Sequence, residues 1–299
     1  MSRQLRVFQV DAFTRERFTG NPAGVVLDAQ GLEPDTMQAI ARELGQGDTA
    51  FVLPATDGTH DLQVRFFTPR SEAGFVGHAT LAAHAVLAAL GLPEQPRQQQ
   101  RTGLVTIERH AGADGQRFAF CQPPPPLQAG PEPEWLPKAL DALGIARADL
   151  DPRLPPVVAG NASTRVLVAL RDAQRLPGLQ PDLARLAALS AAGAPPGFFA
   201  YAVLGSGPQL HTVARMYCPA LGIPEDPVSG NAHAMLAHRL GAGGLLDAST
   251  PLARFEGEQG RPMGRPGRVF VEVENEGGQP RRIRIAGHAT IVWEARLAL

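Results

Sequence analysis

The chain has few of the features by which a sequence alone announces a specialised class of protein. Among its 299 residues only Cys121 and Cys218 are cysteines, which are too few for a disulfide framework and form no CxxC spacing. No apolar run reaches the length of a membrane span. The net charge of −1 at pH 7 gives no reason to expect nucleic acid or an acidic membrane as a partner. Because the start, MSRQLRVFQVDAF, has no apolar signal core, we expect a cytoplasmic protein.

Signatures of bound cofactors and metals are also missing. The sequence contains no GxGxxG followed by an acidic residue, no P-loop and no metal-type spacing of His and Cys. His78 and His84 are six residues apart, and His233 and His238 are five apart, so neither pair shares a helix face well. We therefore expect no cofactor and no metal.

Proline and glycine are abundant, with 28 and 32 copies, and predict many short elements joined by tight turns. A hydrophobic content of 44% is typical of a globular protein. The apolar periodicity of residues 34–44 predicts a helix, with Pro34 at its first position and Gly45 just after its end. A second helix, over residues 78–90, is apolar on nearly every side and is expected to be buried.

Two stretches match at a separation near half the chain. RFFTP at 65–69 resembles RMYCP at 215–219, and a Glu-x4-Gly spacing that begins at Glu72 recurs at Glu225. In each case the glycine leads into an Ala-rich helix, so the order of the matches indicates an internal duplication. The predicted fold class is α+β, with two similar domains that each wrap strands around one central helix. The run CQPPPP is a natural exit from the first domain.

The starts of the two repeated helices are the candidate sites. If the halves face each other, both helix N-termini can point into one cleft and offer N–H groups to a carboxylate or an enolate. In the second loop, EDPVSGNAH, Ser229 is a good N-cap type and Gly230 permits close approach of a ligand. A purely structural interpretation stays open at this point. Ser229 and Asp226 could only cap a helix, and His78 could be an ordinary core histidine.

Five segments between residue 11 and residue 287 stand out: GNPAGVV, the helix followed by GDTAFV, FTP…E…FVGHAT, EDPVSGNAHA and QGRPMGRPG. In sequence and in order, they resemble the PhzF-like family of phenazine-biosynthesis isomerases. The resemblance implies the diaminopimelate-epimerase-like fold, with two pseudo-symmetric domains that are each a mixed β-sheet or barrel wrapped around a central α-helix. The expected halves are residues 1–120 with the strand 287–299, and residues 121–286, with the active-site cleft between them. It also implies a homodimer.

The resemblance implies a cofactor-independent isomerase that moves a proton on a small carboxylate-bearing substrate, similar to trans-2,3-dihydro-3-hydroxyanthranilate isomerase. The family's general acid/base is a glutamate, and the matching residue here is Asp48, which is one methylene shorter. Proton transfer needs heavy atoms roughly 2.6–3.2 Å apart. A backbone shift, a bulkier substrate or a bridging water could compensate for the shorter acid. The same Gly-Asp-Thr is also ordinary turn chemistry.

The other site residues are carried over position by position. His78 and Asp226 match polar residues that orient the substrate and help relay the proton, so the expected catalytic residues are Asp48, His78 and Asp226. The residues expected to bind the substrate are Asn21, Gly77, Ser229, Gly230 and Asn231. Ser229 stands where many relatives have threonine, and Asn231 where a small residue is frequent, so recognition at Asn231 is expected to differ.

Two other functions stay open. One is a small-anion or metabolite-binding protein that lost catalysis through the shorter acid, and the other is an amino-acid epimerase of the same fold. Two-base racemases of this fold use one thiol beside each helix start. Cys121 precedes the proline run and Cys218 lies several residues ahead of Gly230, so a thiol pair is disfavoured. Beyond an acidic group, the motifs do not identify the substrate, which is expected to be a small molecule.

Overall fold

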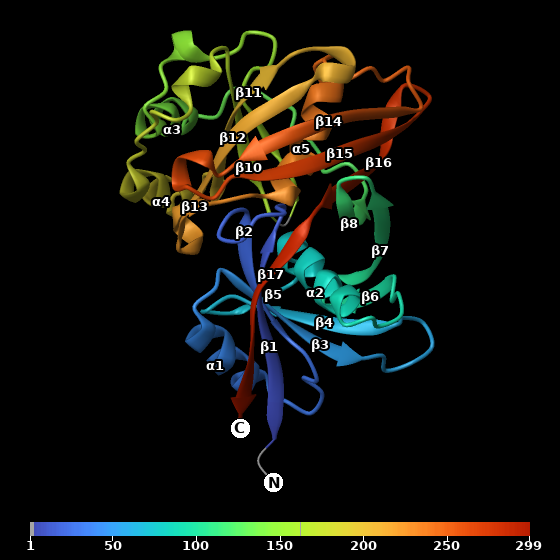
Figure 1. The fold of residues 1–299 in the computed structure, drawn as a ribbon. Coiled ribbons are helices and arrows are strands. Elements are labelled where there is room, and N and C mark those ends of the chain that lie inside the picture. Colours follow the sequence, from blue (N-terminus) through green and yellow to red (C-terminus); the bar gives the residue numbers. More distant parts are fainter. Residues whose placement is uncertain (1–2, 162) are drawn as a thin grey trace. The chain divides into compact units, whose positions relative to one another are not determined.

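The computed structural model describes residues 3–161 and 163–299 (Figure 1). The chain divides into two compact units, one formed by residues 1–121 with 286–299 and the other by residues 122–285. Each unit is a mixed sheet that packs against a buried helix. The architecture is therefore α+β, as the sequence predicts.

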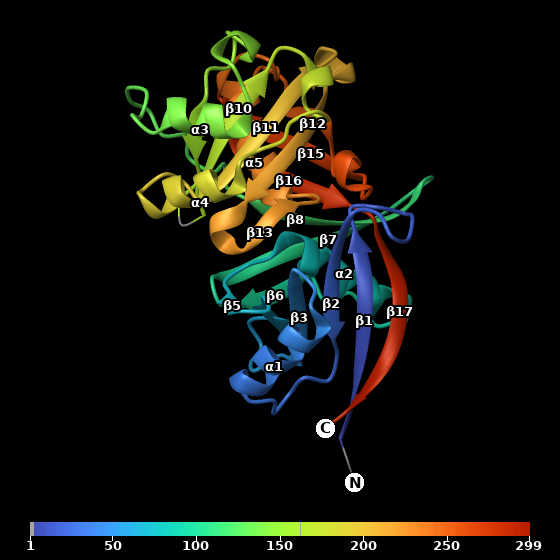
Figure 2. The same ribbon diagram turned by 90° about the vertical axis from the view of Figure 1, so that its left-hand side faces the viewer.

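The first unit contains helices α1 (Pro34–Leu44) and α2 (Gly77–Ala89). Its strands are β1 (Gln4–Ala12), β2 (Asn21–Val26), β3 (Asp48–Pro54), β4 (Leu62–Phe67), β5 (Glu72–Ala73), β6 (Arg97–Gln100), β7 (Gly103–Gly112), β8 (Gly115–Gln122) and β17 (Ala289–Ala298). β1 lies between β17 and β2, antiparallel to both (Figure 2). The sheet continues with a parallel β2–β3 pair, an antiparallel β3–β4 pair, a parallel β4–β6 pair and an antiparallel β6–β7 pair.

The second unit contains helices α3 (Leu136–Leu143), α4 (Leu183–Ala191) and α5 (Gly230–Ala242). Its strands are β9 (Val157–Ala159), β10 (Arg165–Leu170), β11 (Gly197–Leu204), β12 (His211–Cys218), β13 (Ile223–Asp226), β14 (Leu252–Gln259), β15 (Gly267–Glu276) and β16 (Gln279–Gly287). Short 3-10 helices are η1 (Arg147–Asp149), η2 (Ala173–Arg175), η3 (Gly207–Gln209), η4 (Pro219–Leu221) and η5 (Arg261–Met263).

The pairing of the second unit repeats that of the first. β10–β11 is parallel, β11–β12 antiparallel, β12–β14 parallel and β14–β15 antiparallel. This series matches β2–β3, β3–β4, β4–β6 and β6–β7. α5 follows β13 as α2 follows β5, so the two helices are counterparts. The internal duplication predicted from the sequence is confirmed.

α2 is the buried helix that the sequence predicts. All nine residues from Ala79 to Leu87 are buried, and the helix contacts β1, β2, β3 and β17. Figures 1 and 2 both show it beside these strands. α1 also agrees with its prediction, because Pro34 is its first residue and Gly45 ends it in the left-handed region at φ 65°. The sheet of the first unit therefore packs on a central helix whose buried residues are apolar except for Thr80 and His84.

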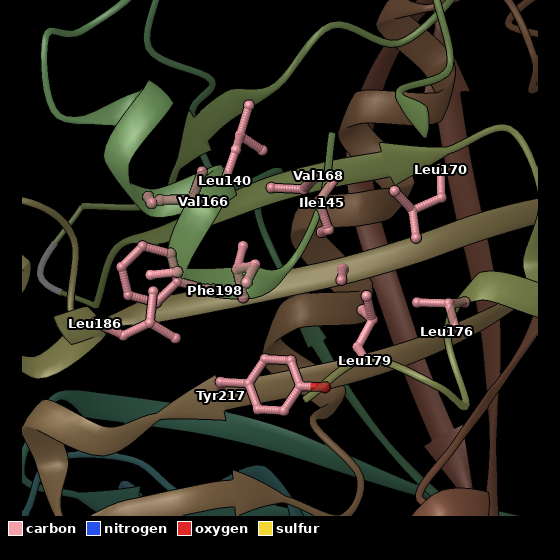
Figure 3. Close-up of a cluster of buried hydrophobic side chains, with 14 of the residues drawn as sticks. Leu140, Ile145, Val166, Val168, Leu170, Leu176, Leu179, Leu186, Phe198 and Tyr217 are labelled. Atoms are coloured by element: carbon pink, nitrogen blue, oxygen red, sulfur yellow. The ribbon is translucent and has the colours of Figure 1, made fainter. Parts of the chain in front are cut away.

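The core of the second unit is a cluster of buried aliphatic and aromatic side chains (Figure 3). Leu140 comes from α3 and Leu186 from α4, and they meet alternate residues of the strands, such as Val166 and Val168 of β10 and Phe198 of β11. Alternation of this kind is what one buried face of a sheet requires. The cluster fixes β10 and β11, whose first residues matter for the site described below.

Three strands have little signal in the sequence. The segment FEGEQGRPMGRPG is rich in glycine, yet its first five residues belong to β14. β3 begins at Asp48, two residues ahead of the apolar run that starts at Ala50. β6 has the sequence RQQQ. In β6 and β14 the buried positions include glutamine and glycine, which carry no hydrophobic alternation, so these strands lack the usual signal.

Candidate active site

Asp48 begins β3, directly after the Gly45-to-Gly47 turn that ends α1. Its register partner is Ala23 of β2, so the residue is fixed at the first position of a parallel strand pair and does not lie in a turn. The side chain is only 12% exposed. A carboxylate held this firmly in partial burial is a better candidate for chemistry than a residue in an exposed turn.

His78, the second residue of α2, lies beside this carboxylate. Its Nε2 is 3.7 Å from Oδ2 of Asp48. Burial lowers the pKa of His78 to about 4, so the imidazole is neutral at neutral pH. Within the described chain, the buried Nε2 has no hydrogen-bond partner. The pair is therefore a carboxylate beside a neutral, desolvated ring rather than a full ion pair.

The start of α2 packs closely against Phe120 and has no side-chain cap. A Cβ on Gly77 would lie 2.8 Å from the ring of Phe120, so only glycine fits between the helix and that ring. Val76, the N-cap residue, makes no side-chain cap. The N–H groups of the first turn are consequently not occupied by a capping side chain, and they carry the partial positive charge of a helix start.

Asn21 lies at the same end of the sheet. It is the first residue of β2, it is buried, and it precedes by two residues the Ala23 that pairs with Asp48. Since side chains two residues apart in a strand share a face, Asn21 and Ala23 lie on one side of β2. In the first unit, the structure thus gathers Asn21, Asp48, Gly77 and His78 at one end of the sheet.

The second unit builds its helix start differently. Ser229 is the N-cap of α5, and its hydroxyl accepts the N–H of Ala232 at 3.3 Å. The ring of His233 donates from Nδ1 to the Ser229 carbonyl at 2.8 Å, and burial lowers the pKa of His233 to about 4. Asp226 ends β13, just ahead of this cap. The cap predicted from the sequence is confirmed.

Gln259 is a residue that sequence reasoning missed. Its Oε1 accepts the N–H of Ser229 at 3.1 Å, and its Nε2 donates to the carbonyl of Asp226 at 2.6 Å. The side chain is 2% exposed, so both bonds are made in a dry environment. The signal was present in the QGRPMGRPG segment, which begins at Gln259 and is one of the segments that resemble the family. Gln259 fixes the backbone on which Asp226 and Ser229 stand.

Gly230 and Asn231 occupy the first two positions of α5, as Gly77 and His78 do in α2. The repeat therefore places an amide where the first unit has an imidazole. Asn231 is partly buried. This substitution gives the second helix start hydrogen-bonding capacity without a group that titrates near neutral pH.

The thiols do not form a catalytic pair. Cys121 and Cys218 are not joined in a disulfide, and burial raises the pKa of Cys218 to about 12. Cys121 donates to Oε1 of Glu108 at 3.6 Å. A thiol that stays protonated is a poor base and a poor nucleophile. This agrees with the prediction that a thiol-pair racemase is disfavoured.

Within residues 3–161 and 163–299, no group of three or more His, Cys, Asp and Glu side chains is arranged to hold a metal ion. No helix within these residues is long and apolar enough to cross a membrane.

The fold is shared with solved enzyme structures. A crystal structure of a PhzF-family phenazine biosynthesis protein from Bacillus anthracis matches with a TM-score of 0.85 and 26% identity, covering 99% of this chain and 100% of that one. A predicted epimerase from Pseudomonas aeruginosa matches with a TM-score of 0.78 and 28% identity over 98% of each chain. A hydroxyproline epimerase from Agrobacterium vitis, 14% identical with a TM-score of 0.57, shares the fold alone. The chain has the diaminopimelate-epimerase-like fold of the isomerases.

Sequence relatives identify the family within that class. The family model described as phenazine biosynthesis-like protein matches residues 10–295. An uncharacterized isomerase from Clostridium acetobutylicum is 34% identical over 100% of both chains, and the uncharacterized isomerase YddE of Escherichia coli O157:H7 is 38% identical over 98% of both. The chain belongs to the PhzF family of phenazine biosynthesis-like proteins, and it is an isomerase.

Proposed function

We propose that this isomerase moves a proton on a small carboxylate-bearing substrate, without a cofactor, and that Asp48 carries the proton. The observation that supports the proposal most directly is the 3.7 Å approach of Asp48 Oδ2 to His78 Nε2 at the start of α2. The site offers a base, a neutral hydrogen-bonding ring and a helix start with no side-chain cap from Val76. These are the groups that an allylic proton shift requires.

In the proposed reaction, Asp48 removes a proton from an activated carbon and, once protonated, returns it to another carbon of the same conjugated system. The electron pair stays within the substrate, and Asp48 exchanges its proton with solvent before it protonates the second carbon, so no oxidant or co-reactant is needed and solvent deuterium enters the product. His78 stays neutral at neutral pH because its pKa is about 4, and it acts through hydrogen bonding. The N–H groups at the start of α2 stabilise the negative charge that develops on the substrate.

The second unit supplies substrate binding in this proposal. Ser229, Gly230 and Asn231 present the start of α5 to the substrate carboxylate, and Asp226 takes part in relaying the proton. In the first unit, Asn21 and Gly77 complete the binding groups. The hydrogen bonds of Gln259 to the loop before α5 support this assignment, since they hold its backbone in one geometry. That both helix starts serve one cleft stays a prediction from the sequence.

The experiment is solvent deuterium incorporation, with trans-2,3-dihydro-3-hydroxyanthranilate as the first compound offered, followed by other small unsaturated carboxylates. The wild-type protein is expected to place deuterium on a substrate carbon. Asp48→Asn is expected to lower the rate by about 10³-fold or more, because it keeps the shape of the side chain but removes the base. Asp35→Asn, at an exposed position of α1 in the same unit, is the matched control and is expected to exchange normally.

Three results would contradict the proposal. Exchange that survives Asp48→Asn removes Asp48 from the mechanism. Tight carboxylate binding by the wild type, with no exchange in any bound compound, instead indicates a binding protein. Exchange of the α-proton across a panel of free amino acids indicates an epimerase.

A further inference from the structure

Arg165 belongs to the strand pair of the second unit that corresponds to the Ala23–Asp48 pair of the first unit. In the first unit, Ala23 of β2 is paired with Asp48 of β3. In the second unit, the corresponding pair is Arg165 of β10 with Gly197 of β11, and again each strand pair is parallel. Gly197 therefore corresponds to Asp48. The charged residue of the second unit, Arg165, lies on the neighbouring strand, at the position that corresponds to Ala23.

The side chain of Arg165 fills the space that a side chain at Gly197 would need. A Cβ on Gly197 would lie 2.2 Å from Cδ and 2.6 Å from Nε of Arg165. The next contact of that Cβ is Cε of Met216, at 3.0 Å. The glycine thus permits the guanidinium to lie across β11, where the first unit holds a carboxylate. At this strand pair, the first unit therefore has a negative side chain and the second unit a positive one.

This guanidinium has unusually little to bind in the protein. Its Nη1 donates to the adjacent Thr164 carbonyl at 2.8 Å, whereas the buried Nε has no hydrogen-bond partner among the described residues. Within the same part of the chain, no carboxylate forms an ion pair with it. By contrast, Arg65 and Arg215 are each paired with a glutamate through two hydrogen bonds. A half-buried guanidinium without an anion is costly, and its fork geometry suits a carboxylate.

The loop before α5 lies within the electrostatic reach of this group. The pKa of the Cys218 thiol is raised mainly by burial, and in addition Arg165 lowers it while Asp226 raises it. Both charges therefore act on one thiol at the end of β12. Because Asp226 is held by Gln259 at the start of α5, Arg165 lies at the same end of the second unit as the proposed binding residues.

We propose that Arg165 binds a second acidic group of the substrate, so that this isomerase selects dicarboxylates over monocarboxylates. The inference rests on the proposed function, in which N–H groups at the helix starts bind the first carboxylate. Those backbone groups carry only partial charge and match one carboxylate, whereas the unpaired guanidinium adds a full positive charge that a second one neutralises.

The test is calorimetry with succinate and with propionate as the matched monocarboxylate. The wild type is expected to bind succinate at least about tenfold more tightly than propionate, as a charge-assisted bidentate contact predicts. Arg165→Gln is expected to weaken succinate binding about 10- to 100-fold and to leave propionate within about twofold. Arg165→Lys, which keeps the charge and loses the fork, is expected to fall between them.

Two further variants guard against a purely structural effect. Gly197→Ala, which pushes a methyl group into the space of the Arg165 side chain, is expected to weaken succinate binding in the same way. Arg171→Gln, at an exposed arginine just beyond β10, is the matched control and is expected to bind like the wild type. Thermal unfolding of each variant checks that it folds.

Three results would overturn the inference. Arg165→Gln could weaken the binding of succinate and propionate equally, it could leave succinate binding unchanged, or the wild type could show no saturable binding of succinate. Asp48→Asn is expected to bind succinate normally. A failure of the deuterium experiment and a failure of this one are therefore distinguishable.

Discussion

The starts of α2 and α5 occupy the same place in two repeated sheets, yet they carry different groups. α2 has His78 at its second position, with Asp48 beside it and no capping side chain at Val76. α5 has Asn231 at its second position and a serine hydroxyl that caps its first turn. The first start holds the base that is proposed to take the proton. At the second start, Ser229, Gly230 and Asn231 donate and accept hydrogen bonds, and Asp226 just ahead of them is the acid proposed to relay the proton.

The strands next to the two helices differ in the same sense. The pair Ala23 and Asp48 in the first unit becomes Arg165 and Gly197 in the second. The duplication has kept the backbone frame, while at this strand pair a carboxylate in the first unit corresponds to a guanidinium in the second. We infer that the main proton transfer takes place at Asp48 in the first unit and that the second unit contributes mainly anion binding, with Asp226 as a proton relay.

The largest effect is expected from giving α2 the residue of its counterpart. His78→Asn removes the imidazole that lies 3.7 Å from Asp48 and keeps a hydrogen-bonding side chain. kcat is expected to fall by about 100-fold or more, with KM changed much less, because the lost contact serves the transition state. Steady-state kinetics on a compound that the wild type isomerises measures this split. Asn231→Ser is the paired variant and is expected to change mainly KM.

Equal effects of these two substitutions on kcat would break the proposed division between the units.

A second comparison concerns pH and the buried imidazoles. Burial lowers the pKa of His78, His84 and His233 from 6.5 to about 4. Between pH 4 and pH 6.5 the imidazole binds a proton in the unfolded chain but not in the folded chain. The contribution of each imidazole to the free energy of unfolding is therefore greatest above pH 6.5, and it is lost as the pH decreases towards 4. Each imidazole is expected to contribute about 2 kcal/mol to the loss between pH 7 and pH 5.

Urea unfolding of His84→Gln at pH 7 and at pH 5 tests the contribution of one buried imidazole. His84 Nε2 bonds Oε1 of Gln98 at 3.0 Å and is not part of the proposed site. The loss between pH 7 and pH 5 is expected to be about 2 kcal/mol smaller in the variant than in the wild type. His110→Gln, at an exposed position, is the control, and a loss as large in His84→Gln as in this control would contradict the account.

The smallest effect is expected at Gln259, whose two hydrogen bonds hold the loop before α5. Gln259→Glu keeps the shape of the side chain and its acceptor for Ser229, but it removes the donor to the Asp226 carbonyl. KM is expected to rise by about tenfold with kcat changed less than about threefold, since one buried hydrogen bond is lost. Gln100→Glu, at the corresponding strand position of the first unit, is expected to leave KM unchanged.

A fall in kcat without a change in KM for Gln259→Glu would place this residue in the chemistry rather than in positioning.

Much of the frame follows from the sequence, because the features that fix it are local. The all-round apolar character of α2, the Pro34 and Gly45 boundaries of α1 and the matched segments of the two halves predict the central helices and the duplication. The cap by Ser229 follows from residue type and position. These features depend on neighbours within one turn or one strand.

The rest depends on partners that are distant in the chain. β6 and β14 bury glutamines, which are stable inside the protein only because other polar groups satisfy them. The role of Gln259 rests on contacts about thirty residues away, with Asp226 and Ser229. The exchange of charge between Asp48 and Arg165 becomes visible only when the registers of both sheets are known. No hydrophobic periodicity encodes such relations.

The central claim is that the shortened acid, Asp48, still reaches the substrate. A crystal structure of Asp48→Asn with the compound that the wild type labels with deuterium tests it most directly. The account predicts the substituted side chain at position 48 within about 3.5 Å of the labelled carbon, with a carboxylate of the compound at the helix starts. A labelled carbon that lies out of reach of position 48 and against another acid, such as Asp226, would contradict it.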